Sequence, residues 1–157
     1  MTQHMLSHLR LDWLDNLISV FLIRSPAEVI ASYAKARPDL TAEDIGFAQQ
    51  LRLYQHVKQH IHSDPLVIST EQVLTNPRSC LEKICDYCQV DFSDSMLQWP
   101  AGSRASDGVW APWWYSNVEK STGFSPYQKK QITLDQNQQQ IADLCEPFYQ
   151  AMLEQSN

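Results

Sequence analysis

The chain has 157 residues, 43% of them hydrophobic, which argues for one globular domain with a core rather than a disordered chain. A formal net charge of −6 and a sequence pI near 5.2 argue against a general nucleic-acid binder, because clustered lysines and arginines hold phosphate backbones. Four cysteines, with no signal peptide and no long apolar run, predict a cytoplasmic protein that does not enter the membrane.

A short amphipathic piece, residues 1–16, precedes an apolar run over residues 17–23. This run is rich in β-branched and aromatic residues, which predicts a parallel strand buried on both faces. Arg24 follows at the carboxyl end of the strand, where ligands of open α/β sheets bind. We therefore predict an anion site at Arg24. The alternative is that Arg24 only pairs with a neighbouring carboxylate.

The helix that follows Arg24 has a well-specified start. Ser25 predicts the cap, Pro26 suits the first helical position, and Glu28 completes a capping box. Ser32 lies two turns into this helix, close to the face that carries Ser25 and Glu28. Its hydroxyl is therefore placed to join Arg24 around one phosphate.

Further along the chain, Thr41 and Asp44 predict the start of a long helix that ends near His62. Residues 66–70 predict a second short strand, parallel to the first, because the helix between them has the length of a crossover. Asn76 predicts the cap of another helix, which begins with a proline.

Residues 96–125 hold four of the five tryptophans and three of the four glycines, and they predict a structured loop with one or two short helices. The tryptophans either fill a core or stack on a ligand ring. Thr133 and Gln136 predict the start of a terminal helix that is kinked at Pro147. The predicted buried side of this helix carries Leu134, Ile141, Leu144, Cys145, Phe148 and Met152.

Two pairs of residues have the spacing of metal ligands, and for both we favour a structural role. The CxxC that begins at Cys85 lies on the apolar face of its helix and has no second pair, which favours core residues over a metal or redox site. His56 and His60 are four residues apart. Gln49 and Arg52 share the face of His56, which favours a solvated surface. We expect no metal site.

The segment RSPAEVIASY, which starts at Arg24 and contains Ser32, resembles the 3′-phosphate-binding segment of sulfotransferases. That segment opens with Arg-x-Pro and has a serine eight residues after the arginine. The resemblance implies that Arg24 and Ser32 bind the 3′-phosphate of 3′-phosphoadenosine 5′-phosphosulfate, the sulfuryl donor and co-substrate. It also implies an α/β fold with a short parallel sheet flanked by helices, a partial P-loop NTPase-like sulfotransferase fold.

The histidines of the N-terminal segment acquire a role from the same resemblance. In related bacterial sulfotransferases, a Lys-x-Met and His-rich residues precede the strand that carries the arginine, and a histidine takes the proton of the acceptor hydroxyl. His8 is the first candidate for this base and His4 the second, since an imidazole with a pKa near neutrality suits the role. Gln3 stands where the family has the lysine, so this chain departs from the pattern at the residue that would stabilise the leaving group.

Later segments extend the resemblance. The string STEQVL, residues 69–74, is similar to the family's Tyr-Glu-Asp-Leu segment, with Thr70 in place of the tyrosine and a structural role expected for Glu71. In the family a late loop with basic residues and glycines closes over the nucleotide. The candidates for this loop are Arg104, Lys120, Ser121 and Gly123.

The strings DGVWAPWWY, residues 107–115, and STGF, residues 121–124, are similar to one bacterial subgroup. That subgroup often carries the label branched-chain aminotransferase-like. We interpret the label as a misnomer, because nothing in the sequence supports a pyridoxal phosphate site.

A phosphate loop is missing from the residues before Arg24, which contain no glycine-rich or Lys-Ser/Thr stretch; the first glycine is Gly46. We therefore expect residues 1–157 to form a single, N-terminally incomplete sulfotransferase domain. Its sheet would have exposed edges, through which we expect a homo-oligomer to form.

The sequence thus predicts a sulfotransferase that moves a sulfuryl group from the phosphosulfate donor to the hydroxyl or amine of a small-molecule acceptor. Because the phosphate loop is missing, the alternative is a catalytically inactive remnant that binds nucleotide or a protein partner. A phosphoryl-transfer kinase of related fold is disfavoured, because no metal-binding Ser, Thr or Asp follows a phosphate loop.

Overall fold

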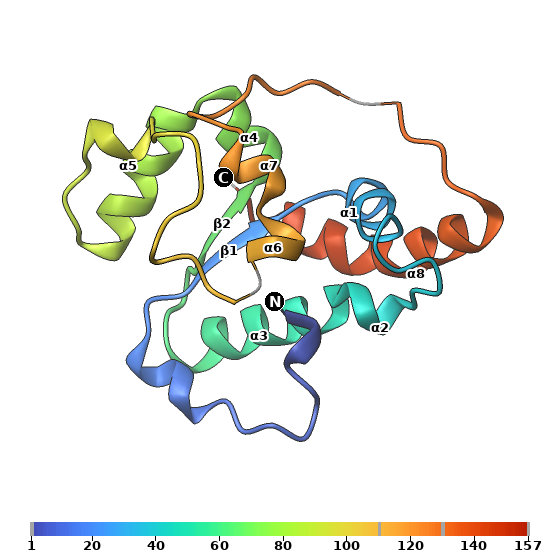
Figure 1. Cartoon of the computed structure of the whole chain (residues 1–157). Coiled ribbons are helices and arrows are strands. Elements are labelled where there is room, and N and C mark those ends of the chain that lie inside the picture. Colours follow the sequence, from blue (N-terminus) through green and yellow to red (C-terminus); the bar gives the residue numbers. More distant parts are fainter. Residues whose placement is uncertain (1, 110, 130, 157) are drawn as a thin grey trace. The chain divides into compact units, whose positions relative to one another are not determined.

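The computed structural model describes residues 2–109, 111–129 and 131–156, without the side chains of residues 113 and 114 (Figure 1). The chain divides into two compact units, Met1–Glu71 with Lys129–Asn157, and Gln72–Gln128. Along the chain, the elements are the 3-10 helices η1 (Thr2–His4) and η2 (Asp12–Asn16), β1 (Val20–Ile23), α1 (Pro26–Tyr33), α2 (Ala42–Ile45), α3 (Phe47–His60), β2 (Leu66–Ser69), α4 (Thr70–Thr75), α5 (Pro77–Cys88), η3 (Asp94–Met96), α6 (Ala111–Trp114), α7 (Ser116–Glu119) and α8 (Gln136–Leu153).

The first unit contains a two-stranded parallel sheet in which Val20 of β1 pairs with Leu66 of β2. This confirms the expected α/β class with a short parallel sheet and flanking helices. The first strand is shorter than the run over residues 17–23, because β2 has four residues and offers no partner to residues 17–19. The expected burial on both faces is also wrong, since Leu22 is 57% exposed.

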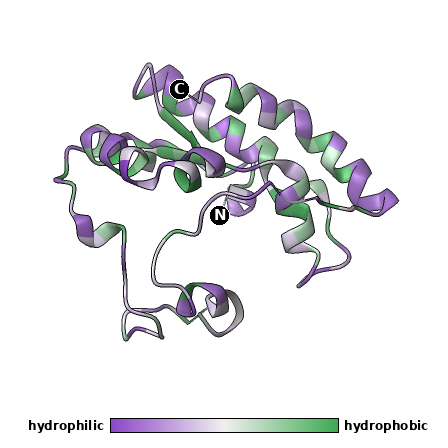
Figure 2. Cartoon of the chain, turned by 90° about the horizontal axis from the view of Figure 1, so that it is seen from above, coloured by the Kyte–Doolittle hydropathy of each residue, from purple (hydrophilic) through white to green (hydrophobic). Residues whose placement is uncertain are grey.

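Two clusters of buried side chains stabilise the first unit. The cluster against the sheet contains Leu14, Phe21, Ile23, Leu53, Tyr54, Val57, Val67 and Met152. The cluster among the helices contains Ile30, Leu40, Ile45, Phe47, Ile141, Ala142 and Cys145. Helix α8 contributes to both clusters and packs against α1 and α3 (Figure 1). Figure 2 shows hydrophobic and hydrophilic residues alternating around the turns of the longer helices, as expected of helices that bury one face.

Helix α8 differs in two respects from its prediction. Asp135, rather than Thr133, is the cap, and it forms a capping box with Gln138. The helix runs through Pro147 to Leu153. Leu144, which the pattern places on the buried side, is 62% exposed.

A glycine divides the predicted helix over residues 41–62 into two. Thr41 and Asp44 form the expected capping box at the start of α2, and their hydrogen bonds lower the pKa of the Asp44 carboxyl. Helix α2 then ends at Gly46, whose φ of 81° lies in the left-handed region. A Cβ at this position would lie 2.6 Å from the main-chain nitrogen of Gln3. Glycine is therefore required both by the turn and by the close approach of the N-terminal segment.

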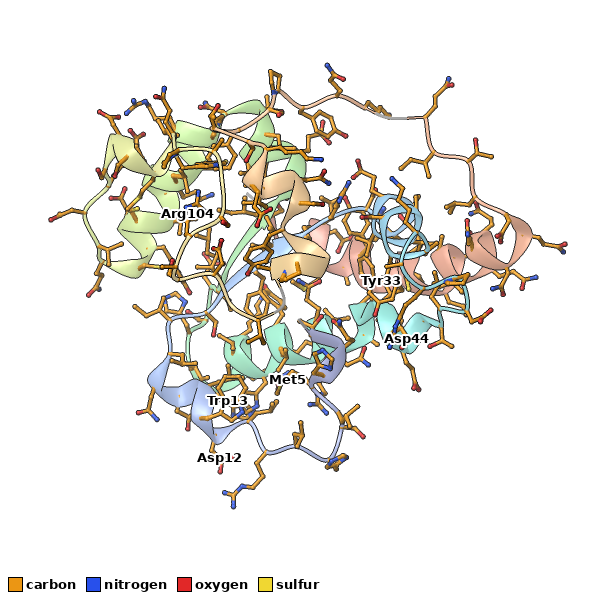
Figure 3. All side chains as sticks on the ribbon, in the orientation of Figure 1. Met5, Asp12, Trp13, Tyr33, Asp44 and Arg104 are labelled. Atoms are coloured by element: carbon orange, nitrogen blue, oxygen red, sulfur yellow. The ribbon has the colours of Figure 1, made fainter. Side chains whose placement is uncertain are left out.

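The N-terminal segment covers part of α3. The hydroxyl of Thr2 donates to the carbonyl of Gly46 at 3.0 Å, and Met5 packs against the sheet-side cluster (Figure 3). Arg52 Nη2 donates to the carbonyl oxygens of Met5, at 3.3 Å, and Leu6, at 3.0 Å. The contacts span more than forty residues of sequence.

The face of α3 that carries Gln49, Arg52 and His56 is half-buried and not the solvated surface that was expected. Gln49 Oε1, Arg52 Nε and His56 Nε2 are buried, and they have no hydrogen-bond partner in the part of the chain that the structure describes. The rings of His56 and His60 are adjacent, with centroids 4.9 Å apart. For Arg52, the periodicity of α3 alone does not predict this burial, because its contacts are with Met5 and Leu6, far away in sequence.

The second unit contains α5, whose predicted cap is confirmed because the side chain of Asn76 accepts from the main-chain nitrogen of Ser79. On the apolar face of α5, Cys85 is buried and Cys88 half-buried, and both are free thiols. The expected loop with short helices is also confirmed by α6 and α7. Trp110 lies outside the described residues.

Among the described residues, no group of three or more histidine, cysteine or acidic side chains is arranged to hold a metal ion. None of the helices in this part of the chain has the length and apolar character needed to cross a membrane.

Candidate functional site

Arg24 is placed by the end of β1 and the start of α1. It directly follows the last residue of β1, and the next two residues are the cap and first residue of α1. The Arg24 side chain is 38% exposed, and its Nε lies 3.4 Å from Glu28 Oε2. The predicted position at the carboxyl end of a parallel strand is thus correct. The pairing with a neighbouring carboxylate, which the sequence left open, is also present.

The start of α1 differs from the predicted capping box. Pro26 occupies the first position as expected, but the side chain of Ser25 makes no capping hydrogen bond. Instead, Ser25 Oγ donates to Glu28 Oε2 at 3.2 Å. One carboxylate oxygen therefore receives hydrogen bonds from both Arg24 and Ser25, and the capping box is not formed.

Ser32 lies on the same side of α1 as this cluster. Glu28 and Ser32 are four residues apart in α1, which places them on one face of the helix. Ser32 is in the last turn of α1 and is exposed. Because Arg24 contacts Glu28, its guanidinium lies on the side of α1 where Ser32 follows one turn later.

Thr70 also helps to form this region, a role that the sequence analysis did not predict. Its hydroxyl donates to the carbonyl of Ile23 at 3.1 Å, and so joins the end of β2 to the end of β1 beside Arg24. The side chain of Glu71, for which a structural role was expected, is exposed and makes no hydrogen bond or ion pair in the described residues. A hydroxyl at the end of a predicted strand is the signal that points to Thr70.

The two candidate bases lie on the N-terminal segment. His4 ends η1, and His8 follows in a turn; both are exposed. No hydrogen bond or ion pair joins either histidine to Arg24 or Ser32 in the described residues. Between the two histidines, the segment is anchored by Arg52, whose side chain donates to the carbonyl oxygens of Met5 and Leu6.

The candidates of the late loop lie in the second unit, where hydrogen bonds order the chain around Ser121. Trp99 Nε1 donates to Ser121 Oγ at 3.0 Å, and Ser121 Oγ donates to the carbonyl of Val118 at 2.7 Å. Gly123 pairs with Gln98 in an antiparallel bridge. A Cβ on Gly123 would lie 3.0 Å from the carbonyl oxygen of Leu97, so the close approach favours glycine there.

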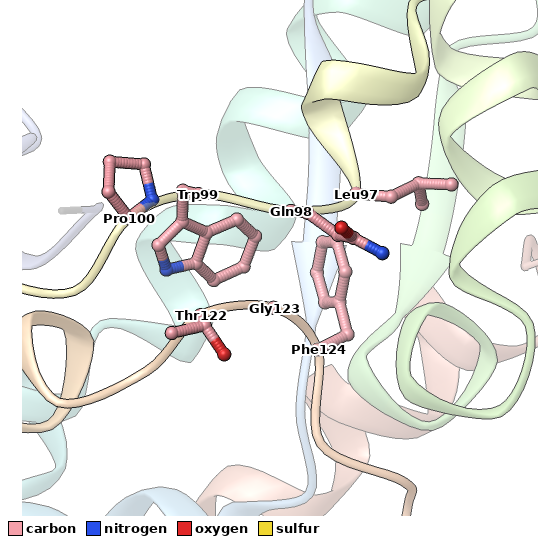
Figure 4. A pocket seen from close by; sticks show the side chains of 7 residues that line it. All are labelled: Leu97, Gln98, Trp99, Pro100, Thr122, Gly123 and Phe124. Carbon is pink, nitrogen blue, oxygen red and sulfur yellow. The ribbon is translucent and has the colours of Figure 1, made fainter.

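The same loop lines an open hollow of about 610 Å³, formed by Leu97, Gln98, Trp99, Pro100, Thr122, Gly123 and Phe124 (Figure 4). The rings of Trp99 and Phe124 meet edge to face, with centroids 5.4 Å apart. Trp99 thus packs within the unit. Arg104 does not line this hollow, and its main-chain nitrogen donates to the carboxylate of Asp107 at 2.7 Å. Lys120 is exposed.

Comparison with known proteins gives a family-level match over almost the whole chain. The family model described as a sulfotransferase domain matches residues 1–156. Two Arabidopsis thaliana proteins, the branched-chain-amino-acid aminotransferase-like proteins 2 and 1, are each 34% identical to this chain over 128 residues. The matches cover 82% of this chain but 22% and 23% of those proteins, so the chain spans less than a quarter of their length.

Among solved structures, a sulfotransferase domain from the curacin biosynthetic pathway is similar to this chain with 17% sequence identity and a TM-score of 0.45. The similarity covers 81% of this chain and 52% of that one.

Proposed function

The chain belongs to the sulfotransferase domain family, and we propose that it binds 3′-phosphoadenosine 5′-phosphosulfate and takes part in sulfuryl transfer to the hydroxyl or amine of a small molecule. The observation that carries the proposal is Arg24: a partly exposed guanidinium at the carboxyl end of a parallel strand, with an exposed serine hydroxyl on the same side of the following helix. Charge-assisted hydrogen bonds from such groups suit a phosphate monoester.

In the proposed arrangement, Arg24 and Ser32 hold the 3′-phosphate of the donor. Arg24 supplies a cation with several N–H donors, and Ser32 supplies one hydroxyl donor. The main-chain nitrogens at the start of α1 add their partial positive charge on the same side of the sheet. Arg104, Lys120, Ser121 and Gly123 are proposed for the nucleotide through the family resemblance, with Ser121 and Gly123 ordered by their contacts to Trp99 and Gln98.

The proposed chemistry is an in-line displacement at sulfur. The acceptor oxygen attacks sulfur, the bond from sulfur to the bridging oxygen of the 5′-phosphate breaks, and 3′-phosphoadenosine 5′-phosphate leaves. His8 takes the proton of the acceptor, and its exposure in the turn after η1 gives a substrate access to the imidazole. His4 is the second candidate for this role.

Transfer of radiolabelled sulfate from the donor to a panel of small alcohols and amines tests the activity. We expect His8→Gln to lower the rate by about 10²-fold to 10⁴-fold, the range for a general base, while 3′-phosphoadenosine 5′-phosphate still binds. His60→Gln is a matched control, because His60 is an exposed histidine on α3. An unchanged rate in His8→Gln would exclude His8 as the base.

A second candidate function is binding without catalysis. It is favoured by Gln3, which stands at the position of the expected lysine, the residue that would stabilise the leaving group. Under this alternative, the nucleotide binds through Arg24, but the wild-type chain transfers no sulfate to any acceptor. The transfer assay, run beside a binding measurement, separates the two functions.

A further inference from the structure

The carboxylate of Glu28 pairs with the guanidinium of Arg24, which is the group that binds a phosphate in the proposed function. Glu28 Oε2 lies 3.4 Å from Arg24 Nε and 3.2 Å from Ser25 Oγ, and the Glu28 side chain is only 16% exposed. A phosphate that binds Arg24 would lie beside this negative charge. The two anions repel each other at such a distance, so the position of Glu28 bears directly on the affinity of the site.

The sequence offers Glu28 a second position. Ser25 and Glu28 have the Ser-x-x-Glu spacing of a capping box, in which the serine hydroxyl accepts from the main-chain nitrogen of Glu28 and the carboxylate accepts from that of Ser25. This box is not formed in α1. The comparable boxes of α2, from Thr41, and α8, from Asp135, are formed in the same unit. In α2 the box partner Asp44 also contacts an arginine, but through its other oxygen: Arg37 Nη1 lies 3.8 Å from Asp44 Oδ1, while Asp44 Oδ2 accepts from Thr41.

We propose that Glu28 is a positioning residue with two alternative partners: it holds Arg24 while the site is free of ligand, and it moves to the capping box with Ser25 when a phosphate binds Arg24. This inference rests on the proposed function for the identity of the ligand, a phosphate monoester. The partly exposed Arg24–Glu28 pair has a long contact, and exposed pairs of this kind contribute little to stability. An incoming dianion therefore replaces it at little cost.

The move conserves favourable interactions. The carboxylate gives up a hydrogen bond from Arg24 and one from the Ser25 hydroxyl, and gains one from the Ser25 main-chain nitrogen. The Ser25 hydroxyl then becomes an acceptor for the main-chain nitrogen of Glu28. The negative charge also stays at the N-terminal end of α1, where the helix dipole favours it.

The variant Glu28→Gln separates the two roles, because glutamine completes a capping box but carries no charge. We expect it to bind 3′-phosphoadenosine 5′-phosphate about 2-fold to 5-fold more tightly than the wild type at low salt, since an exposed pair contributes a free energy of this order. In the Arg24→Ala background, the same substitution should change affinity by less than about 2-fold. Glu43→Gln, which neutralises an exposed carboxylate in the first turn of α2, is the matched control and should not change affinity.

A second measurement follows the capping box itself. In the wild type, saturating ligand should shift the amide resonance of Ser25 downfield, as a new hydrogen bond to its main-chain nitrogen requires, and Ser25→Ala should weaken binding by about 2-fold to 5-fold through the lost cap. Weaker or unchanged binding by Glu28→Gln would overturn the proposal. So would a gain of equal size in the Arg24→Ala background, or an unmoved Ser25 resonance at saturation.

Inorganic phosphate serves as a probe that does not depend on the nucleotide. If Glu28→Gln binds phosphate more tightly than the wild type, and neither protein prefers the nucleotide to phosphate, the role of Glu28 stands and the proposed nucleotide function fails. If the nucleotide binds through Arg24 but Glu28→Gln gives no gain, the proposed function stands and the role of Glu28 fails. If neither protein binds either anion, both fail.

Discussion

The hydroxyl of Thr70 donates a hydrogen bond to the main-chain carbonyl of Ile23 across 3.1 Å. Thr70 follows the last residue of β2, and Ile23 is the last residue of β1, so this bond joins the carboxyl ends of the two strands. Arg24 is the next residue along the chain. The bond therefore restrains the main chain at the point from which the Arg24 side chain extends.

We predict that Thr70→Val lowers the free energy of unfolding by about 1 kcal/mol, because it removes this hydrogen bond at nearly constant shape. Urea unfolding followed by circular dichroism measures the change. Thr75→Val is the control, since Thr75 ends the same short helix and is exposed. Equal stability of the Thr70→Val variant and the wild type would show that the bond does not contribute.

Gly46→Ala should destabilise the chain by about 1 to 2 kcal/mol from the left-handed backbone alone, and by more because the new Cβ would meet the main chain of Gln3. Gly102→Ala provides the control: Gly102 also has a positive φ, of 109°, but nothing lies within 4 Å of a Cβ there. The difference between the two variants in urea unfolding measures the contact with the N-terminal segment. Equal losses in both variants would contradict that contact.

These residues also show which parts of the structure the sequence predicts. Pro26 and the apolar run before Arg24 are local signals, and they place the strand end and the helix start correctly. The extent of β1 is not local, because the partner strand β2 determines how many residues can pair. The partial burial of Arg52 is likewise missed by helical periodicity, since it comes from contacts with residues more than forty positions away.

The candidate site follows the same division. Arg24 and Ser32 are recognisable in the sequence because they belong to one strand-to-helix segment with regular spacing. The partners of Glu28 are less predictable: the Ser-x-x-Glu spacing favours a capping box, but the adjacent guanidinium competes for the carboxylate. Thr70 becomes important only once β2 pairs with β1 in the observed register.

Burial raises the pKa of the Cys145 thiol from 9.0 to about 11, with a smaller contribution from Glu146. Above about pH 9, the unfolded chain therefore loses this proton while the folded chain keeps it, and the free energy of unfolding falls as the pH rises towards 11. The expected loss is about 1 kcal/mol between pH 8 and pH 10. Urea unfolding at both pH values, for the wild type and for Cys145→Ala, should show this loss in the wild type only. A loss of the same size in the variant would assign it to other groups.

Self-association through the outer part of β1 stays a prediction. Ile18 and Leu22 are 56% and 57% exposed, and antiparallel pairing of two copies about Val20 would place Ile18 opposite the Leu22 of the second copy. Leu22→Lys should then abolish the dimer in sedimentation equilibrium, while Leu144→Lys, on an exposed position of α8, should not. A wild-type chain that stays monomeric at all concentrations tested would refute this prediction.

The most direct test of the central claim is calorimetric titration of 3′-phosphoadenosine 5′-phosphate into the wild type, Arg24→Ala and Arg37→Ala. Arg37 is an exposed arginine whose ion pair is with Asp44, which makes it a matched control. The account predicts that Arg24→Ala weakens binding by about 1.5 to 3 kcal/mol, that Arg37→Ala does not, and that the loss disappears with adenosine 5′-phosphate, which lacks the 3′-phosphate. Equal affinity of Arg24→Ala and the wild type for the 3′-phosphorylated nucleotide would contradict the assignment of Arg24.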